Sequence, residues 1–145
     1  MRAAFAIAAL LALTACGQPK PPEVDPAKQA AVAALPAPYN AASYAEGRNV
    51  FRQCRSCHVI AAGAPHRAGP NLHGVFGRHI GTSEGFTYSQ AVRDADFVWD
   101  ADHLDHWLQN PQTFLPGNRM GFAGVHDDTE RRDLIAYLMV ESGAQ

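Results

Sequence analysis

The stretch FRQCRSCHVI, residues 51–60, decides the fold because it sets Cys54, Cys57 and His58 in the order C-R-S-C-H. Two thiols separated by two residues can form a redox-active disulfide, supply half of a zinc site or attach a haem. A thioredoxin-like dithiol should follow a strand in a βαβ unit, whereas this pair follows a helical pattern. A structural zinc site needs four ligands, and no second Cys pair or Cys-His pair has the required spacing.

Haem attachment is the reading that uses all three residues. Cys54 and Cys57 would form thioethers with the porphyrin edge, and His58 would ligate the iron from one side. The sequence therefore predicts one covalently bound haem c.

A haem that carries electrons needs a second axial ligand, for which Met120 is the best candidate. Met1 belongs to the leader, and Met139 lies on the apolar stripe of the last expected helix. Met120 lies in the loop PGNRMG, residues 116–121, whose Pro and Gly favour a fixed turn, and a thioether suits iron. Six other histidines, for which we expect surface or hydrogen-bonding roles, could compete for this position: His66, His73, His79, His103, His106 and His126.

The first 15 residues, MRAAFAIAALLALTA, have the pattern of a signal peptide, with an early Arg, an apolar run and small residues before Cys16. The apolar run is shorter than the roughly 20 residues that cross a bilayer. The junction LTAC resembles a bacterial lipobox, so we expect cleavage before Cys16 and acylation of its thiol, which anchors a protein without a transmembrane helix. An ordinary secretory signal with a stray Cys is the alternative.

Residues 16–42 are rich in Ala and Pro and hold few large apolar side chains, so we expect a lipidated Cys followed by a flexible linker. The folded domain should then span residues 43–145. The chain has 12 Lys and Arg against 14 Asp and Glu, and both lysines lie in the linker. This balance predicts weaker electrostatic steering than in a basic protein, with a small basic rim near the Cys-His and Met segments.

The pattern of the domain predicts helices joined by long loops. Ser43 and Glu46 fit a capping box that opens a helix running towards Cys54. A short helix is expected over residues 89–93, and a longer one over residues 101–109, which Pro111 should stop. A last helix should open near residue 127, and no alternating strand pattern of useful length is present. The fold class is therefore all-α.

In the C-R-S-C-H segment, the Met120 loop and the expected helices, the sequence resembles the class I c-type cytochromes. This group includes mitochondrial cytochrome c and related bacterial proteins. The motifs CRSCH, GPNLHGVFGR, GFTYSQA, NPQTFLPGNRMGFAG and TERRDLIAYL recur in order over residues 44–140. The resemblance implies the cytochrome c fold, with long loops wrapped around a covalent haem. The N- and C-terminal helices would cross near Gly47, Phe51, Leu134 and Tyr137.

The resemblance also implies further haem-binding residues. Pro70 would accept a hydrogen bond from the ligating His58, which orients the ring. Arg78, Tyr88 and Trp99 match positions that bond or balance a haem propionate. The remaining matches are Asn118 near the propionates and the Met loop, and Phe122 at the exposed haem edge.

Two residues depart from the family pattern. Trp107 stands where the family usually has a Tyr whose hydroxyl touches the Met sulfur, and an indole only donates. Val92 replaces a common Asn near a buried water. Neither change touches an expected ligand.

The function that the resemblance implies is one-electron transfer without catalysis. We expect a monomer on the periplasmic side of a bacterial membrane, held by the lipid at Cys16. It would accept electrons from a cytochrome bc-type complex and pass them to a terminal oxidase or another periplasmic reductase, and would bind neither nucleic acid nor a small-molecule substrate. An electron-transfer subunit of one oxidoreductase and a small haem peroxidase are the alternatives.

Overall fold

The computed structural model describes residues 24–143, and that part of the chain is helical. Its elements in order are α1 (Pro26–Ala33), the 3-10 turn η1 (Tyr39–Ala41), α2 (Tyr44–Phe51), α3 (Gln90–Asp94), α4 (Ala101–Gln109), α5 (Pro111–Phe114) and α6 (Asp128–Glu141). Over these residues the only β-type pairing outside helices is an isolated bridge between His79 and Val98. The prediction of an all-α fold with long loops is confirmed.

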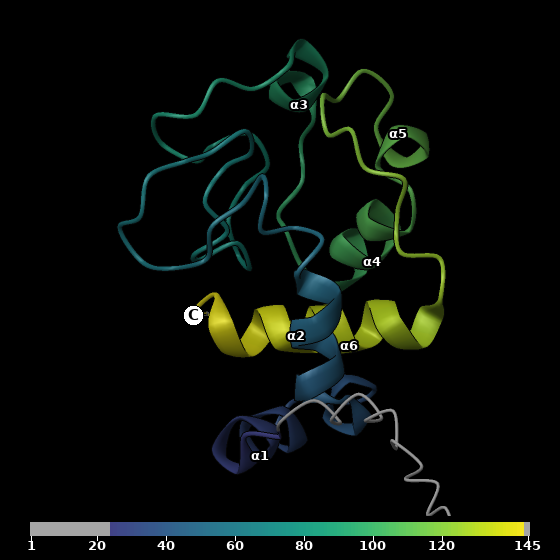
Figure 1. The fold of residues 1–145 in the computed structure, drawn as a ribbon. Helices are drawn as coiled ribbons and strands as arrows, with labels where there is room; N and C mark the ends of the chain where they lie inside the picture. The colour runs from purple at the N-terminus through teal and green to yellow at the C-terminus, as the bar shows by residue number, and fades with distance from the viewer. Residues whose placement is uncertain (1–23, 144–145) are drawn as a thin grey trace, which may run out of the picture.

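The helices α2 and α6 cross at the centre of the molecule, as expected (Figure 1). Gly47 lies at the crossing, and a side-chain Cβ there would overlap the backbone oxygen of Asp133 and lie 2.7 Å from the Cβ of Tyr137. Because glycine lacks that atom, the two backbones can approach closely. The long loops, α3 and α5 lie on one side of α6, and α1 lies on the other side.

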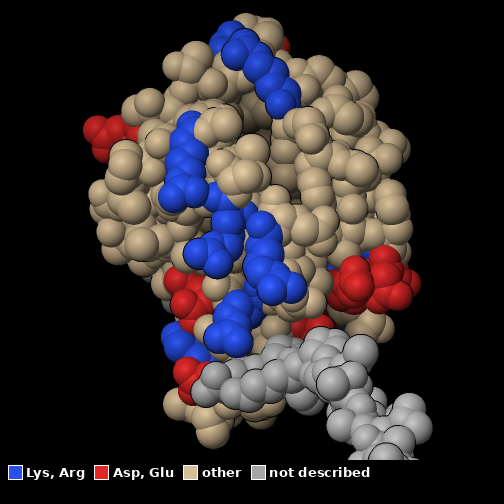
Figure 2. All heavy atoms as spheres, in the orientation of Figure 1, with Lys and Arg blue, Asp and Glu red and all other residues tan. Residues whose placement is uncertain are grey.

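Positive side chains gather on the face of the molecule that Figure 2 shows. Figure 2 shows Lys and Arg side chains in a column over α2 and the segments above it, beside a hollow in the surface. Arg48, Arg52, Arg55 and Arg67 are all exposed, and Arg67 Nη1 donates to the Arg55 carbonyl oxygen at 2.5 Å. Arg52, Arg55 and Arg67 belong to the small basic rim expected near the Cys-His and Met segments, together with Arg119, which is also exposed.

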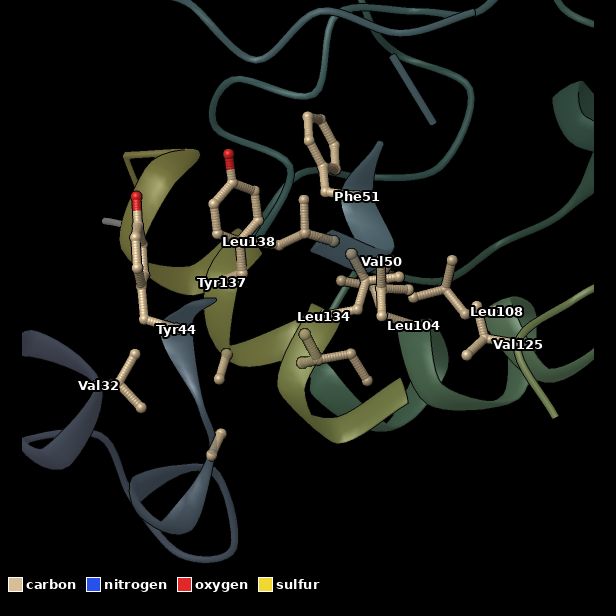
Figure 3. Close-up of a cluster of buried hydrophobic side chains, with 13 residues drawn as sticks. Val32, Tyr44, Val50, Phe51, Leu104, Leu108, Val125, Leu134, Tyr137 and Leu138 are labelled. Carbon is tan, nitrogen blue, oxygen red and sulfur yellow. The ribbon is translucent and has the colours of Figure 1, made fainter. Parts of the chain in front are cut away.

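The core forms where α4 meets the crossing helices (Figure 3). Leu134 and Ile135 of α6 have no exposed surface, and Phe51 stacks obliquely on Tyr137 with ring centroids 5.1 Å apart. Leu104 belongs to the same cluster. Burial of such side chains contributes about 1.5–3 kcal/mol each, so this cluster is the main support for the crossing.

Side-chain caps start the helices at the expected residues. Ser43 Oγ accepts the Glu46 backbone N–H at 3.2 Å, and Asp100 accepts that of His103 at 2.8 Å. Asp127 caps α6 in the same way. The helix α4 ends at Gln109, and Pro111 then occupies the first turn of α5, where its missing N–H is no loss.

The prediction of a flexible linker is wrong over most of residues 24–42. Asp25 caps α1 and Pro26 stands at its first turn, so a helix forms in this Ala-rich segment. Val32 is completely buried, and Leu35 and Tyr39 pack against the core cluster. The few apolar side chains of this segment suffice because α2 and α6 give them a surface to cover.

The expected signal peptide and the lipid site at Cys16 lie outside the described residues. Within residues 24–143, no helix is both long enough and apolar enough to cross a membrane.

Candidate haem site

A cavity of about 390 Å³ lies between the crossing helices and the long loops. Its walls are mostly apolar and include Phe51, Leu104 and Leu134. All nine residues expected to bind the cofactor line it: Cys54, Cys57, His58, Pro70, Arg78, Tyr88, Trp99, Asn118 and Met120. The structure thus brings together residues that are as far as 66 positions apart in the chain.

The segment after α2 turns the two cysteines and His58 towards the cavity. The backbone N–H groups of Cys57 and His58 both donate to the Cys54 carbonyl oxygen, at 3.1 and 2.8 Å. Cys54 is half-buried and Cys57 exposed, and both are free thiols. Burial, and secondly the charge of Cys57, raises the pKa of Cys54 to about 11. The Cys54 sulfur therefore favours the neutral thiol over the thiolate at neutral pH.

His58 is oriented by a loop twelve residues further along. Its Nδ1 lies 2.7 Å from the Pro70 carbonyl oxygen, which leaves Nε2 as the nitrogen available to a metal. Burial lowers the pKa of His58, although the contact with Pro70 partly opposes this, so the ring favours the neutral form that ligates metals. A Cβ at Gly69 would lie 2.8 Å from Nδ1, so only glycine leaves room for this ring.

Met120 is fixed at three atoms. Its backbone N–H donates to Asn118 Oδ1 at 2.8 Å, and its carbonyl oxygen accepts from Gln112 Nε2 at 3.0 Å. Its sulfur accepts the indole N–H of Trp107 at 3.2 Å. Trp107, which stands where the family usually has Tyr, therefore still donates a hydrogen bond to the sulfur. Unlike a Tyr hydroxyl, the indole N–H cannot also accept one.

Asn118 holds the Met loop from within. Its amide nitrogen donates to the carbonyl oxygens of Pro111 at 2.7 Å and Leu115 at 2.8 Å. Both amide hydrogens are thus used inside the loop, and the side chain is buried. Asn118 is placed to shape the turn that presents Met120.

Arg78 and Trp99 join the two loops that flank the cavity. The Arg78 side chain donates to the carbonyl oxygens of His73 and Asn71 at 3.1 and 3.2 Å. The Arg78 carbonyl oxygen accepts the backbone N–H of Trp99 at 2.9 Å. Burial lowers the pKa of Arg78, though Tyr88 opposes the shift. A partly buried cation of this kind favours an anionic partner nearby.

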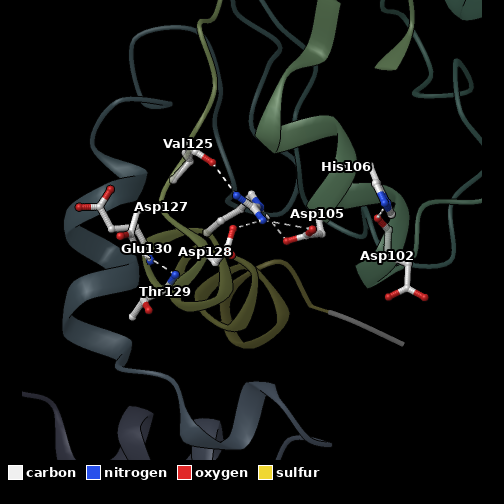
Figure 4. Close-up of polar contacts among 9 residues, drawn as sticks. Asp102, Asp105, His106, Val125, Asp127, Asp128, Thr129 and Glu130 are labelled. Carbon is white, nitrogen blue, oxygen red and sulfur yellow. Dashed lines mark hydrogen bonds and ion pairs between the residues drawn. The ribbon is translucent and has the colours of Figure 1, made fainter. Parts of the chain in front are cut away.

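An ion-pair network between α4 and the start of α6 escaped the sequence reasoning (Figure 4). The side chain of Arg131 is 5% exposed; its Nε donates to Asp105 at 2.7 Å and its Nη2 to Asp128 at 2.8 Å. Its Nη1 donates to the Val125 carbonyl oxygen at 2.9 Å. The hydrogen bond to Asp105 is the main cause that raises the pKa of Arg131. Arg131 thus ties α4, α6 and the segment after Met120 together.

Gly69, Gln112 and Arg131 are therefore the positioning residues that sequence reasoning missed. The Gly-Pro pair at residues 69–70 carried a turn signal, but nothing in the sequence pairs Arg131 with Asp105, 26 residues away. Of the histidines in residues 24–143, only His58 lines the cavity. His66, for example, contacts the Glu84 carbonyl oxygen at 2.7 Å.

These residues fit a haem. The walls are apolar, one neutral imidazole and one thioether face the same cavity, and two free thiols lie beside the imidazole. The tight contact that a side chain at Gly69 would make with His58 shows that the loop is shaped to hold this ring.

Comparison with known proteins agrees with the geometry. The sequence model of the family described as Cytochrome c matches residues 44–140. The chain is 40% identical over 106 residues to cytochrome c of Kluyveromyces lactis, covering 72% of this chain and 96% of that protein. It is 44% identical over 107 residues to cytochrome c2 of Blastochloris viridis, covering 74% of this chain and 84% of the relative. The chain belongs to the cytochrome c family, whose members carry electrons on one covalently bound haem c and are not enzymes.

Proposed function

We propose that Cys54 and Cys57 attach the haem and that His58 Nε2 and Met120 Sδ are its two axial ligands. The observation that carries this proposal is that both candidate ligands face one cavity and are held from outside it, His58 by Pro70 at 2.7 Å and Met120 by Trp107 at 3.2 Å. Ligands held in this way need not move when the charge of the centre changes.

The haem supplies a one-electron couple. The protein keeps the apolar cavity dry through residues such as Leu104 and Leu134, and it holds the imidazole and thioether in place. The partly buried Arg78 is available to balance a propionate, and Tyr88 and Trp99 line the same cavity. A cavity that changes little between redox states favours rapid electron exchange over binding and conversion of a substrate.

The electron carrier is further proposed to be a lipoprotein on the periplasmic side of a bacterial membrane. The support is the leader at residues 1–15 and the lipobox-like junction before Cys16. Its donor would be a cytochrome bc-type complex, and its acceptor a terminal oxidase or another periplasmic reductase. A tether to the membrane that holds these complexes raises their effective concentration.

The arginine column suggests where such partners dock. Arg52, Arg55 and Arg67 are exposed, and Arg67 donates to the Arg55 carbonyl oxygen. Figure 2 shows Lys and Arg side chains beside a hollow in the surface. Cations around a redox cavity attract an acidic partner surface and orient it on approach. Acidic side chains, among them Asp94, Asp96 and the α4 carboxylates, balance this charge elsewhere in the chain.

Membrane fractionation with turnover tests the proposal. The unmodified chain should sediment with membranes and mediate electron transfer between the host's bc-type complex and oxidase. Cys16→Ser should yield a soluble protein with an unchanged haem spectrum. A Cys16→Ser protein that stays with the membrane contradicts lipid anchoring, and a spectrally intact protein that neither complex reduces or oxidises contradicts the assignment of partners.

A further inference from the structure

The helix α1 is fastened to the crossing helices by polar and apolar contacts. Gln29 Nε2 donates to the Ala42 carbonyl oxygen and Gln29 Oε1 accepts the Tyr44 N–H, both at 2.9 Å. Lys28 Nζ lies 2.6 Å from Glu141 Oε1, which also accepts the Tyr44 hydroxyl at 2.9 Å. Together with the buried Val32, these contacts join α1 to α2 and to the end of α6.

The docked helix lies away from the haem site. Figure 1 shows α1 on one side of α6 and the long loops on the other. On the cavity side, α6 contributes Leu134 and Leu138 to the cavity wall, whereas Val32 packs on the outer side of the crossing. Within the described residues, the part of the chain that packs on the haem domain therefore includes α1 from its cap Asp25 onward, and does not start at residue 43.

This start point changes the reach of any membrane anchor at Cys16. Asp25 lies nine positions after residue 16, which limits the extended reach to about 30 Å. With α1 released, the tether would run to Ser43, 27 positions after residue 16, and the limit would be about 90 Å. The corresponding root-mean-square lengths of a flexible chain are about 16 and 28 Å.

We propose that docked α1 shortens the tether and so keeps the haem domain close to its own membrane, with the cavity on the side of α6 away from the point of attachment. This inference rests on the proposed lipidation of Cys16. Its consequence is that the domain exchanges electrons with redox centres embedded in the same bilayer, because partners in an opposing membrane lie beyond the short tether.

Neutron reflectometry of the lipidated full chain on a bilayer of phosphatidylethanolamine and phosphatidylglycerol measures the height of the protein layer. Val32→Asp places a charge in a fully buried position and should release α1, so the layer should move outward by about 10 Å. Ala33→Asp adds the same charge on the exposed side of α1 and should leave the height unchanged. The visible spectrum of each variant reports whether the haem domain remains folded.

A second variant keeps α1 docked and lengthens the tether directly. A Gly/Ser insert of about 18 residues between Val24 and Asp25 should reproduce the outward shift without touching the domain. The proposal is overturned if the unmodified chain already lies as far out as the insertion variant, or if Ala33→Asp moves the layer as much as Val32→Asp. Cys16→Ser should form no protein layer on the bilayer. If the unmodified chain also forms none, the proposed lipid anchor is overturned.

Discussion

Met120 is held more by its surroundings than by its own position in the chain. Trp107 reaches its sulfur, Gln112 its carbonyl oxygen and Asn118 its N–H. The indole is braced in turn by Trp99, edge to face at 5.3 Å between ring centroids. A hydrogen bond on the sulfur draws electron density from the atom that is proposed to ligate the iron.

Replacing Trp107 with Phe should lower the reduction potential, because the sulfur then becomes the better donor to the oxidised iron. The shift should be about 40 mV or less, the equivalent of the ~1 kcal/mol of one neutral hydrogen bond in a one-electron couple. Trp107→Tyr, which restores a hydroxyl donor, is the matched control and should recover part of the shift. Potentiometric titration gives the result, and equal potentials for the Phe variant and the unmodified chain would contradict a role for the N–H.

Sequence reasoning reached the residues that face the cavity and some of those that hold them, such as Pro70 and Trp107, but it missed Gln112 and Arg131. Cys54, Cys57 and His58 are marked by their spacing, and Met120 by its loop. Gln112 and Arg131 carry no such mark, because their partners are fixed only once α4, α5 and α6 are in place.

The crossing of α2 and α6 depends on Gly47, which has no Cβ atom. Gly47→Ala adds a Cβ that would overlap the Asp133 backbone oxygen, so the helices must move apart. The free energy of unfolding should fall by about 1–3 kcal/mol, despite the better helix propensity of Ala. Gly121→Ala is the control, since nothing lies within 4 Å of its added Cβ. Denaturant titration of both variants measures the difference, and equal losses would contradict close packing at Gly47.

The contact between Tyr44 and Glu141 predicts a dependence on alkaline pH. Burial, and then the hydrogen bond to Glu141, raises the pKa of Tyr44 above its usual value. The unfolded chain releases this proton near pH 10, whereas the folded chain keeps it, so the free energy of unfolding falls as the pH rises above about 10. Tyr44→Phe removes this loss. Its deficit in unfolding free energy relative to the unmodified chain should therefore shrink between pH 8 and pH 11, and a constant deficit would contradict the raised pKa.

Among the helices, the starts of α2, α4 and α6 were predictable, whereas α1, its docking and the short α5 were not. Asp100 and Asp127 are capping residues that predict the starts of α4 and α6. Asp25-Pro26 gives the same signal for α1, but the overall Ala and Pro content outweighed it. Whether Val32 has a surface to cover depends on α2 and α6, which are remote in sequence.

The molecule places its cavity on the side of α6 away from α1, and it carries exposed arginines in the segment that holds the two cysteines, among them Arg55. Arg55→Glu should slow electron exchange with an acidic protein partner several-fold at low ionic strength. Near 1 M salt, where the screening length is about 3 Å, the rates should converge. Stopped-flow measurements follow the reaction, with a small uncharged reductant as the control that should not distinguish the two proteins. The same fold loss at both salt concentrations would contradict electrostatic docking.

His58 and Met120 are proposed to occupy both axial positions of one haem. The absorption spectrum of the oxidised full-length protein at neutral pH reports directly on these two ligands. We expect a low-spin spectrum with the weak long-wavelength band of sulfur bound to ferric iron, and loss of that band in Met120→Ala. A spectrum of the unmodified protein that lacks this band, or one that Met120→Ala leaves unchanged, would contradict the claim.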